Sequence, residues 1–253
     1  MQSVIYPQYQ QLLQQHQLAN FEQLWHYQGD WFEPPNRERG GWSGVNFIEL
    51  IDNSGKQHGF YLKRQQAHMR RTWQHPIAGE PTFVREFKIL DYLKSSGVYT
   101  PAIAFYANQQ DKAIILTAAL TGFVSAEEWL KNHALITFKQ KKRLVMALAI
   151  AVKKLHQTSV VHRSLYLKHL FVKECGDNFE VAIIDFEKSR ISILVALLRL
   201  SDLITLCSRT PQINKRLKLA FFKQYFDISH LSQPYKILCS YVYHQSKPKH
   251  NLS

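Results

Sequence analysis

Acidic residues are few in this chain. It has 19 Asp and Glu against 32 Lys and Arg, which gives a formal charge of +13 at pH 7. A surplus of this size favours anionic partners such as nucleic acid, an acidic membrane face or phosphorylated sugars. The basic residues do not gather in one tail or on one helix face, so we do not expect nucleic acid as the partner.

Cysteine is also scarce, and its spacing excludes the common metal and redox motifs. The three residues, Cys175, Cys207 and Cys239, form no C-x-x-C pair. An odd number of cysteines is typical of reduced thiols in a cytosolic setting. We expect all three to behave as small buried hydrophobic side chains.

Long apolar runs are missing. The longest are residues 144–152 and 193–198, whereas a membrane-spanning helix needs about 20 residues. The N-terminus has no basic stretch followed by an apolar one, so no secretory signal is expected. These observations predict a cytoplasmic protein. Its 253 residues, 45% of them hydrophobic, are enough to form a large core in one domain or two lobes.

The hydrophobic pattern predicts a strand-rich first half and a mainly helical second half. In the first half we expect short helices within residues 8–27, a hairpin of strands 45–50 and 59–64 with its turn at 52–55, a helix at 81–94 and strands at 102–107 and 113–116. In the second half, Thr137 and Gln140 fit the capping box of a long helix. A further, mostly apolar helix is expected at 191–208.

A glycine-rich segment, residues 39–44, precedes the first strand of this hairpin. Gly41 and Gly44 would allow backbone N–H groups to approach phosphates closely, because no Cβ is in the way. An ordinary hairpin turn explains the same residues. Lys63 lies on the return strand, and Glu86 lies on the next helix beside its apolar stripe. Taken alone, Glu86 reads as a solvated surface residue.

Residues 65–80 join this strand and this helix. They contain Arg70, Arg71 and His75 around Trp73. Basic groups interleaved with an aromatic ring suit an anionic sugar or a phosphate, and a plain surface loop is the alternative reading.

The most informative stretch is residues 162–190. It predicts a polar loop, a strand at 170–173, a turn and a strand at 181–184 that ends in Asp185-Phe186-Glu187. This order resembles the catalytic segment of protein-kinase-like enzymes, in which H-R-D-x-x-x-x-N precedes D-F-G. Ser164 stands where that motif has its Asp, and His169 stands where it has its Asn.

Together with residues 64–87 and 184–190, this segment resembles the Kdo/WaaP lipopolysaccharide kinase family, and within it the InaA-like branch. The resemblance covers residues 39–209. It implies an α+β, two-lobed protein-kinase-like fold, with an antiparallel β-rich N-terminal lobe (1–117) and a mainly helical C-terminal lobe (118–253). It also implies ATP-dependent phosphorylation of heptose or Kdo in the lipopolysaccharide core, or of a related anionic glycolipid, with peripheral contact at the inner face of the inner membrane.

The resemblance implies a role for each matching residue. Lys63 would contact ATP phosphates, with Gly41 and Gly44 nearby, and Glu86 would orient Lys63. Asp185 would bind Mg²⁺, and His169 would touch a phosphate or hold the loop. His162, Ser164 and Lys168 belong to the catalytic loop, and Arg70, Arg71 and His75 are candidate substrate contacts. Asp202 would bond the catalytic-loop backbone, or else it faces solvent near a helix end.

Ser164 is the main departure from the pattern, because serine cannot act as a base comparable to aspartate. The sequence therefore leaves two functions open: an active sugar kinase, and a pseudokinase that binds nucleotide or a lipid sugar, or scaffolds another enzyme. Glu187 or Lys168 could compensate in part for the missing Asp. A nucleic-acid-binding module is a third reading that rests on charge alone. An aminoglycoside-phosphotransferase-like enzyme would be expected to keep the Asp.

Overall fold

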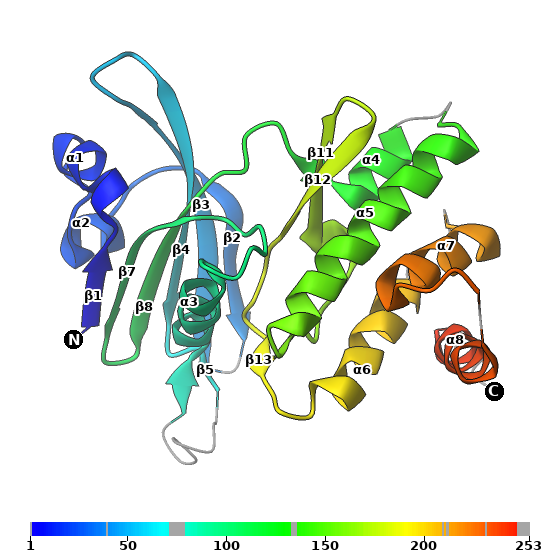
Figure 1. Cartoon of the computed structure of the whole chain (residues 1–253). Helices are drawn as coiled ribbons and strands as arrows, with labels where there is room; N and C mark the ends of the chain where they lie inside the picture. The colour runs from blue at the N-terminus through cyan, green and yellow to red at the C-terminus, as the bar shows by residue number, and fades with distance from the viewer. Residues whose placement is uncertain are drawn as a thin grey trace. The chain divides into compact units, whose positions relative to one another are not determined.

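The structure is a computed structural model of the chain. It describes residues 2–38, 40–70, 79–132, 136–208, 210, 213–230 and 232–246. The chain divides into two compact units (Figure 1). Unit 1 comprises Met1–Tyr92 and Pro101–Thr121, and unit 2 comprises Leu93–Thr100 and Gly122–Ser253.

Unit 1 is built on an antiparallel six-stranded sheet in the order β1-β7-β8-β4-β3-β2. Its strands are β1 (Gln2–Ile5), β2 (Trp31–Glu38), β3 (Gly41–Ile51), β4 (Gln57–Gln66), β7 (Ile103–Gln109) and β8 (Lys112–Ala118). A separate two-stranded pair joins β5 (Met69–Arg70) to β6 (Glu80–Pro81). The predicted hairpin is the pair β3–β4, and its turn closes with Gly55 in the left-handed region (φ 83°).

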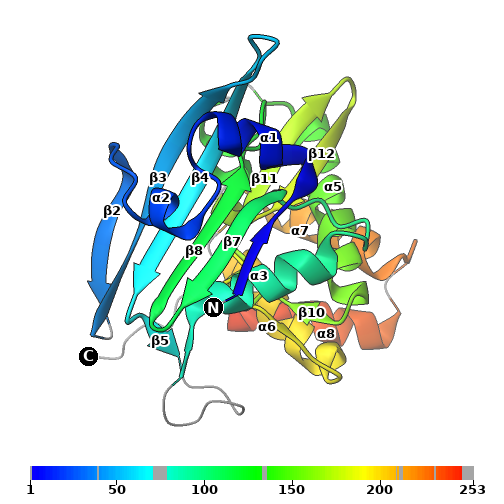
Figure 2. The same ribbon diagram turned by 90° about the vertical axis from the view of Figure 1, so that its left-hand side faces the viewer.

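Helices pack on both faces of this sheet, as the alternation of side chains along β4 requires. The helices α1 (Pro7–Gln15) and α2 (Phe21–Trp25) cover one face of the sheet (Figure 2). Phe60 and Leu62 point to this face, where Leu13 and Leu24 complete a buried core. Lys63 points the other way, toward α3 (Thr82–Leu93). The prediction of short N-terminal helices packed on the sheet is confirmed.

Arg64 fastens the segment after α2 to the sheet. Its guanidinium donates to the carbonyls of Trp25 (2.6 Å) and Tyr27 (3.0 Å) and to Asn46 Oδ1 (2.7 Å), and it lies 4.7 Å from the Trp31 ring. Five donors in a rigid plane suit a buried cation that must satisfy several acceptors at once. A lysine at this position would leave acceptors unsatisfied.

Unit 2 is mainly helical. Its helices are α4 (Ala126–Asn132), α5 (Phe138–Gln157), α6 (Val195–Ser208), α7 (Lys215–Phe226) and α8 (Gln233–Gln245). A small sheet has the order β12-β11-β9, made of β12 (Asn178–Ile183), β11 (Leu170–Cys175) and β9 (Val124–Ser125). The capping box at Thr137 and Gln140 is confirmed, and α5 buries Leu144, Leu148, Val152 and Leu155.

Three expectations about secondary structure need correction. The turn expected at 39–44 is largely strand, because β3 begins at Gly41 and pairs with β2, a strand that the two prolines Pro34 and Pro35 had masked in the sequence. The helix expected at 191–208 begins only at Val195, because Arg190–Ile191 forms β13, which pairs with β10 (Val160–Val161). Residues 65 and 66 extend β4 rather than opening a loop. Across the described helices, none is long and apolar enough to cross a membrane.

Candidate functional site

Lys63 and Glu86 form an ion pair inside unit 1. Lys63 Nζ lies 2.7 Å from Glu86 Oε1, and the side chains are 19% and 3% exposed. Lys63 sits in the middle of the sheet, opposite Val45 on β3 and Ile115 on β8. The predicted pairing is confirmed, and the reading of Glu86 as a solvated residue is wrong.

The helix that carries Glu86 is positioned from the same strand as Lys63. Gln65 Oε1 accepts from Thr82 Oγ1 (2.8 Å) and from the backbone N–H of Phe83 (3.1 Å) at the start of α3. This contact satisfies one of the N–H groups that a helix start leaves open. On the same face, the Phe87 ring stacks on Tyr106 of β7 at 3.7 Å. Strand and helix are thereby locked in the register that brings Lys63 and Glu86 together.

The two glycines expected near phosphates lie in β3, where neighbouring atoms account for them. A Cβ at Gly41 would come within 2.3 Å of the carbonyl of Gln66, and one at Gly44 within 2.7 Å of the Trp31 ring. Both positions therefore need glycine for packing within the sheet. Contact of their backbone with phosphates stays a prediction.

The candidate substrate contacts fall mostly outside the described residues. The backbone of Arg70 pairs with Glu80 in the short β5–β6 ladder. Arg71 and His75 lie in the stretch 71–78, which the structure does not describe. Their role in binding a substrate stays a prediction.

In unit 2 the loop after β10 is held by Asp202 of α6. The Asp202 carboxylate is fully buried and accepts from the backbone N–H groups of His162 and Arg163, each at 2.7 Å. These bonds support Arg163 in the left-handed region (φ 63°), which costs a non-glycine residue about 1–3 kcal/mol. The predicted bond from Asp202 to the catalytic-loop backbone is confirmed, and the solvent-facing alternative is wrong.

The same carboxylate is linked onward to α7. His156 Nε2 lies 3.1 Å from Asp202 Oδ2, and His156 Nδ1 lies 2.7 Å from Tyr225 Oη. Burial raises the pKa of Tyr225 to about 12, so its hydroxyl stays protonated at neutral pH. Helices α5, α6 and α7 thus share one buried polar chain that ends at the loop.

His162 lies in the core. Its Nε2 is 2.9 Å from the carbonyl oxygen of Ile184, and its ring lies 5.1 Å from the ring of Phe186. Burial lowers the pKa of His162, which keeps its ring neutral at neutral pH. These contacts join the loop to the segment that carries Asp185. His162 therefore fits a positioning role.

His169 and Asp185 face each other. His169 Nδ1 is 2.7 Å from the carbonyl of Ser164, and its Nε2 is 3.2 Å from Asp185 Oδ2. Asp185 has left-handed backbone (φ 66°) and a side chain that is 34% exposed, while Ser164 is buried. Lys168 is exposed next to them. His162, Ser164 and His169 of the loop are therefore linked to Asp185 through direct contacts or shared partners.

This cluster could hold a divalent cation only with help from a ligand. Within the described ranges no group of three or more His, Cys, Asp or Glu is arranged to hold a metal. Mg²⁺ in kinase sites is commonly bound by one or two carboxylates together with substrate phosphates. The Asp185 carboxylate fits that pattern, whereas the His169 imidazole is a poor Mg²⁺ ligand.

Comparison with known proteins decides the family. The model of the lipopolysaccharide kinase (Kdo/WaaP) family matches residues 22–225. The chain belongs to this family. It is 35% identical to protein InaA of Escherichia coli (strain K12) over 176 residues, which cover 67% of this chain and 78% of that protein.

A solved structure supports the fold of the whole chain. The structure of WaaP in complex with acyl carrier protein matches with a TM-score of 0.71, covering 97% of this chain and 98% of that one at 19% identity. The family, its InaA-like branch and the protein-kinase-like fold expected from the sequence are confirmed.

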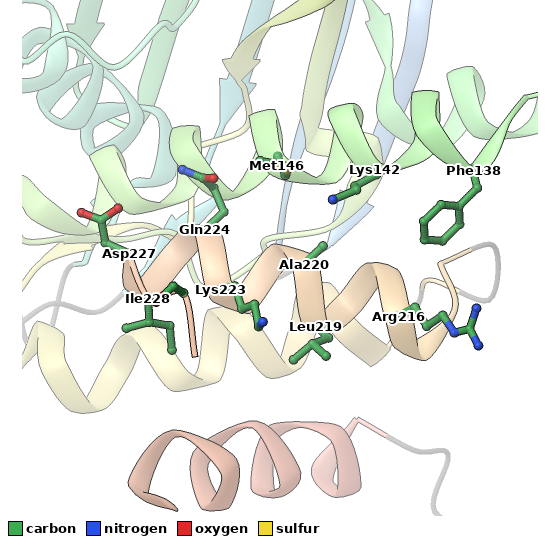
Figure 3. Close-up of a pocket in the computed structure, with 11 residues that line it drawn as sticks. Phe138, Lys142, Met146, Arg216, Leu219, Ala220, Lys223, Gln224, Asp227 and Ile228 are labelled. Atoms are coloured by element: carbon green, nitrogen blue, oxygen red, sulfur yellow. The ribbon is translucent and has the colours of Figure 1, made fainter. Parts of the chain in front are cut away.

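A second surface of unit 2 was not found from the sequence. A groove of about 510 Å³ lies along α5 and α7. Figure 3 shows its cationic side chains, Lys142, Arg216 and Lys223, together with apolar ones, Phe138 and Leu219. None of the predicted site residues lines it. The sequence signal that could have found part of it is the basic and aromatic composition of residues 214–253, which include Arg216 and Lys223.

We predict that Asp202→Ala destabilises unit 2 and loosens the loop. It removes the acceptor of the buried His162 N–H and of the partly buried Arg163 N–H, so the free energy of unfolding should fall by roughly 3 kcal/mol. Amide hydrogen exchange at His162 and Arg163 should accelerate. The control is Asp177→Asn, because Asp177 is 81% exposed and pairs with Arg143 at the surface. Equal stability of the two variants would contradict the role of Asp202.

Acid should destabilise the fold through the buried side chain of His162. The pKa of His162 is lowered in the folded state, so below about 6.5 the unfolded chain binds a proton that the folded chain does not. The free energy of unfolding should therefore fall as pH drops from about 6.5 toward the lowered pKa, by at most about 1.4 kcal/mol per pH unit for this group.

Denaturant titrations between pH 7.5 and 5 measure this slope. His162→Gln should flatten it relative to the wild type. His26→Gln should leave it unchanged, because the His26 side chain is 70% exposed. A slope that His162→Gln does not alter would refute the assignment.

Proposed function

We propose that this protein is an ATP-dependent kinase that phosphorylates a sugar, heptose or Kdo, of the lipopolysaccharide core or of a related anionic glycolipid. The observation that carries the proposal is the buried Lys63–Glu86 pair at 2.7 Å. A buried ion pair is weak as a source of stability. A lysine held in one place by a carboxylate is what the contact with nucleotide phosphates requires. Membership of the lipopolysaccharide kinase family supports the same reaction.

Each residue has a role in this proposal. The Lys63 ammonium neutralises charge on the phosphate oxygens, and the ion pair with Glu86 holds the Lys63 side chain in one conformation. Asp185 and His169 are the protein groups that would hold a divalent ion, which would neutralise charge on the phosphates. His162 and Asp202 keep the loop in shape. The excess of 13 positive charges favours a polyanionic acceptor.

Ser164 cannot take the acceptor proton as an aspartate would. The loose transition state of phosphoryl transfer depends mainly on positioning and electrostatics, so a slow reaction is compatible with this residue. We propose that Ser164 lowers the rate of transfer without removing it. Lys168 is exposed, next to His169 in the sequence, and can contact the phosphate charge.

The first test is calorimetric titration with Mg²⁺·ATP and with Mn²⁺·ATP. We expect micromolar, metal-dependent binding that weakens at least about tenfold in Asp185→Asn and is unchanged in Asp177→Asn. In transfer assays with dephosphorylated lipopolysaccharide core as acceptor, Ser164→Asp should raise the rate by at least about tenfold. No nucleotide binding with either metal would overturn the kinase proposal.

The alternative function is a catalytically impaired kinase fold that serves as a regulatory or scaffold protein. The groove along α5 and α7 favours it, because cationic and apolar side chains line it together and suit an anionic, amphipathic protein segment. WaaP, which shares the fold, was solved with a protein partner, acyl carrier protein. Nucleotide binding without phosphate transfer in the assays above would favour this alternative.

We further propose that residues after β13 contact the membrane that carries the acceptor. Ile193, Leu194 and Leu197 are 98%, 58% and 68% exposed. Lys188 and Arg190 lie nearby in the sequence and are exposed as well. Apolar side chains flanked by cations are typical of segments that dock on anionic lipid surfaces.

Vesicle flotation tests this contact. The wild type should float with vesicles of phosphatidylethanolamine and about 30% phosphatidylglycerol, because such anionic vesicles have a negative surface potential. Ile193→Gln combined with Leu197→Gln should reduce the bound fraction severalfold at unchanged stability. Ile237→Gln, at a 65% exposed position on α8, is the control. Equal flotation of all three proteins would refute the contact.

A further inference from the structure

The tautomer of His169 is set by its neighbour. A backbone carbonyl can only accept a hydrogen bond, so the 2.7 Å contact with the carbonyl of Ser164 requires a proton on Nδ1. In the neutral ring, Nε2 then carries a lone pair. That lone pair faces Asp185 Oδ2 at 3.2 Å.

Two electron-pair donors at this distance need a positive species between them, either a proton or a metal ion. The exposed part of Asp185 leaves room for further ligands. A metal-bound histidine usually donates a hydrogen bond from its other ring nitrogen to a carbonyl or carboxylate, as His169 does to the carbonyl of Ser164.

The spacing also fits a shared ion. Metal–nitrogen and metal–oxygen bonds of about 2.1 Å at a right angle place the two donor atoms about 3.0 Å apart, close to the observed 3.2 Å. An imidazole nitrogen with one carboxylate favours first-row transition ions, whereas Mg²⁺ prefers oxygen ligands. An asparagine in place of His169 would offer Mg²⁺ an oxygen.

We propose that this site binds its nucleotide with Mn²⁺, or another first-row divalent ion, held by His169 Nε2 and the Asp185 carboxylate, in preference to Mg²⁺. The inference rests on the proposed nucleotide-binding function and names the ion of that site. Nucleotide phosphates supply the remaining ligands.

The test is pulsed electron paramagnetic resonance of Mn²⁺·ADP with the full chain. A directly bound histidine gives a ¹⁴N coupling, which should change when the protein is labelled with ¹⁵N-histidine. The labelling comparison needs no variant, so a folding defect cannot obscure it. His169→Asn should abolish the coupling and shift the affinity ratio of Mn²⁺·ADP to Mg²⁺·ADP by about tenfold toward Mg²⁺.

His58→Asn is the matched control. His58 Nε2 also lies close to a carboxylate, 2.8 Å from Asp52 Oδ2, but the other oxygen of Asp52 accepts from Ser54 and Lys56. This variant should keep both the coupling and the preference for Mn²⁺. The ¹⁴N signal must therefore follow His169 alone.

Two results would overturn the inference, and they are distinguishable. Bound Mn²⁺·ADP without nitrogen coupling, and with an affinity ratio that His169→Asn leaves unchanged, would mean that a proton joins His169 to Asp185; the proposed kinase function would still stand. Absence of ADP binding with either ion would overturn the kinase function and the metal assignment together.

Discussion

The Asp202 carboxylate is the contact on which the loop of unit 2 depends. Two backbone N–H groups, those of His162 and Arg163, donate to it at 2.7 Å. These bonds offset the strain of Arg163. With the loop fixed, the His162 ring reaches the carbonyl of Ile184 and thereby places Asp185 against His169. One buried carboxylate thus sets the geometry of residues more than 20 positions apart.

The arrangement of unit 1 depends on a simpler constraint: successive side chains along a strand point to opposite faces of the sheet. Leu62 and Arg64 point to the face that α1 and α2 cover, so Lys63 must point to α3. Gln65 then caps α3, which brings Glu86 to Lys63. The polar pair is therefore held by packing on both faces of the sheet. This is why a cation and an anion with little solvent exposure can be tolerated there.

The chain keeps some, but not all, of the residues of the kinase pattern. Lys63, Glu86 and Asp185 stand at the positions where the kinase pattern has its lysine, its glutamate and its D-F-G aspartate, whereas Ser164 replaces the aspartate of the loop and His169 replaces the asparagine. A kinase fold keeps its shape through the backbone contacts of Asp202 and His162, which do not involve Ser164 Oγ. The fold can consequently persist whether transfer is fast, slow or lost.

Periodicity and local motifs were enough to predict much of the fold. The hairpin β3–β4, helix α3, the capping box of α5 and the order of loop and strands after His162 depend on contacts between residues close in sequence, and all were confirmed. The family followed from the residues after His162 and before Arg190, whose spacing is specific. Strand β1 was missed because it is short and pairs with the distant strand β7. Strand β2 was missed because it contains two prolines, although it pairs with the neighbouring strand β3.

The sequence by itself predicted which residues lie close together, but it did not predict their burial or the direction of their hydrogen bonds. It placed Lys63 with Glu86, and it brought His169 and Asp185 into one motif. Only the tertiary structure showed that Glu86 is buried, that Gly41 and Gly44 serve packing in a strand, and that His169 contacts the Ser164 carbonyl through Nδ1 and faces Asp185 with Nε2. The reason is that burial and hydrogen-bond direction depend on atoms from distant segments, which no local pattern encodes.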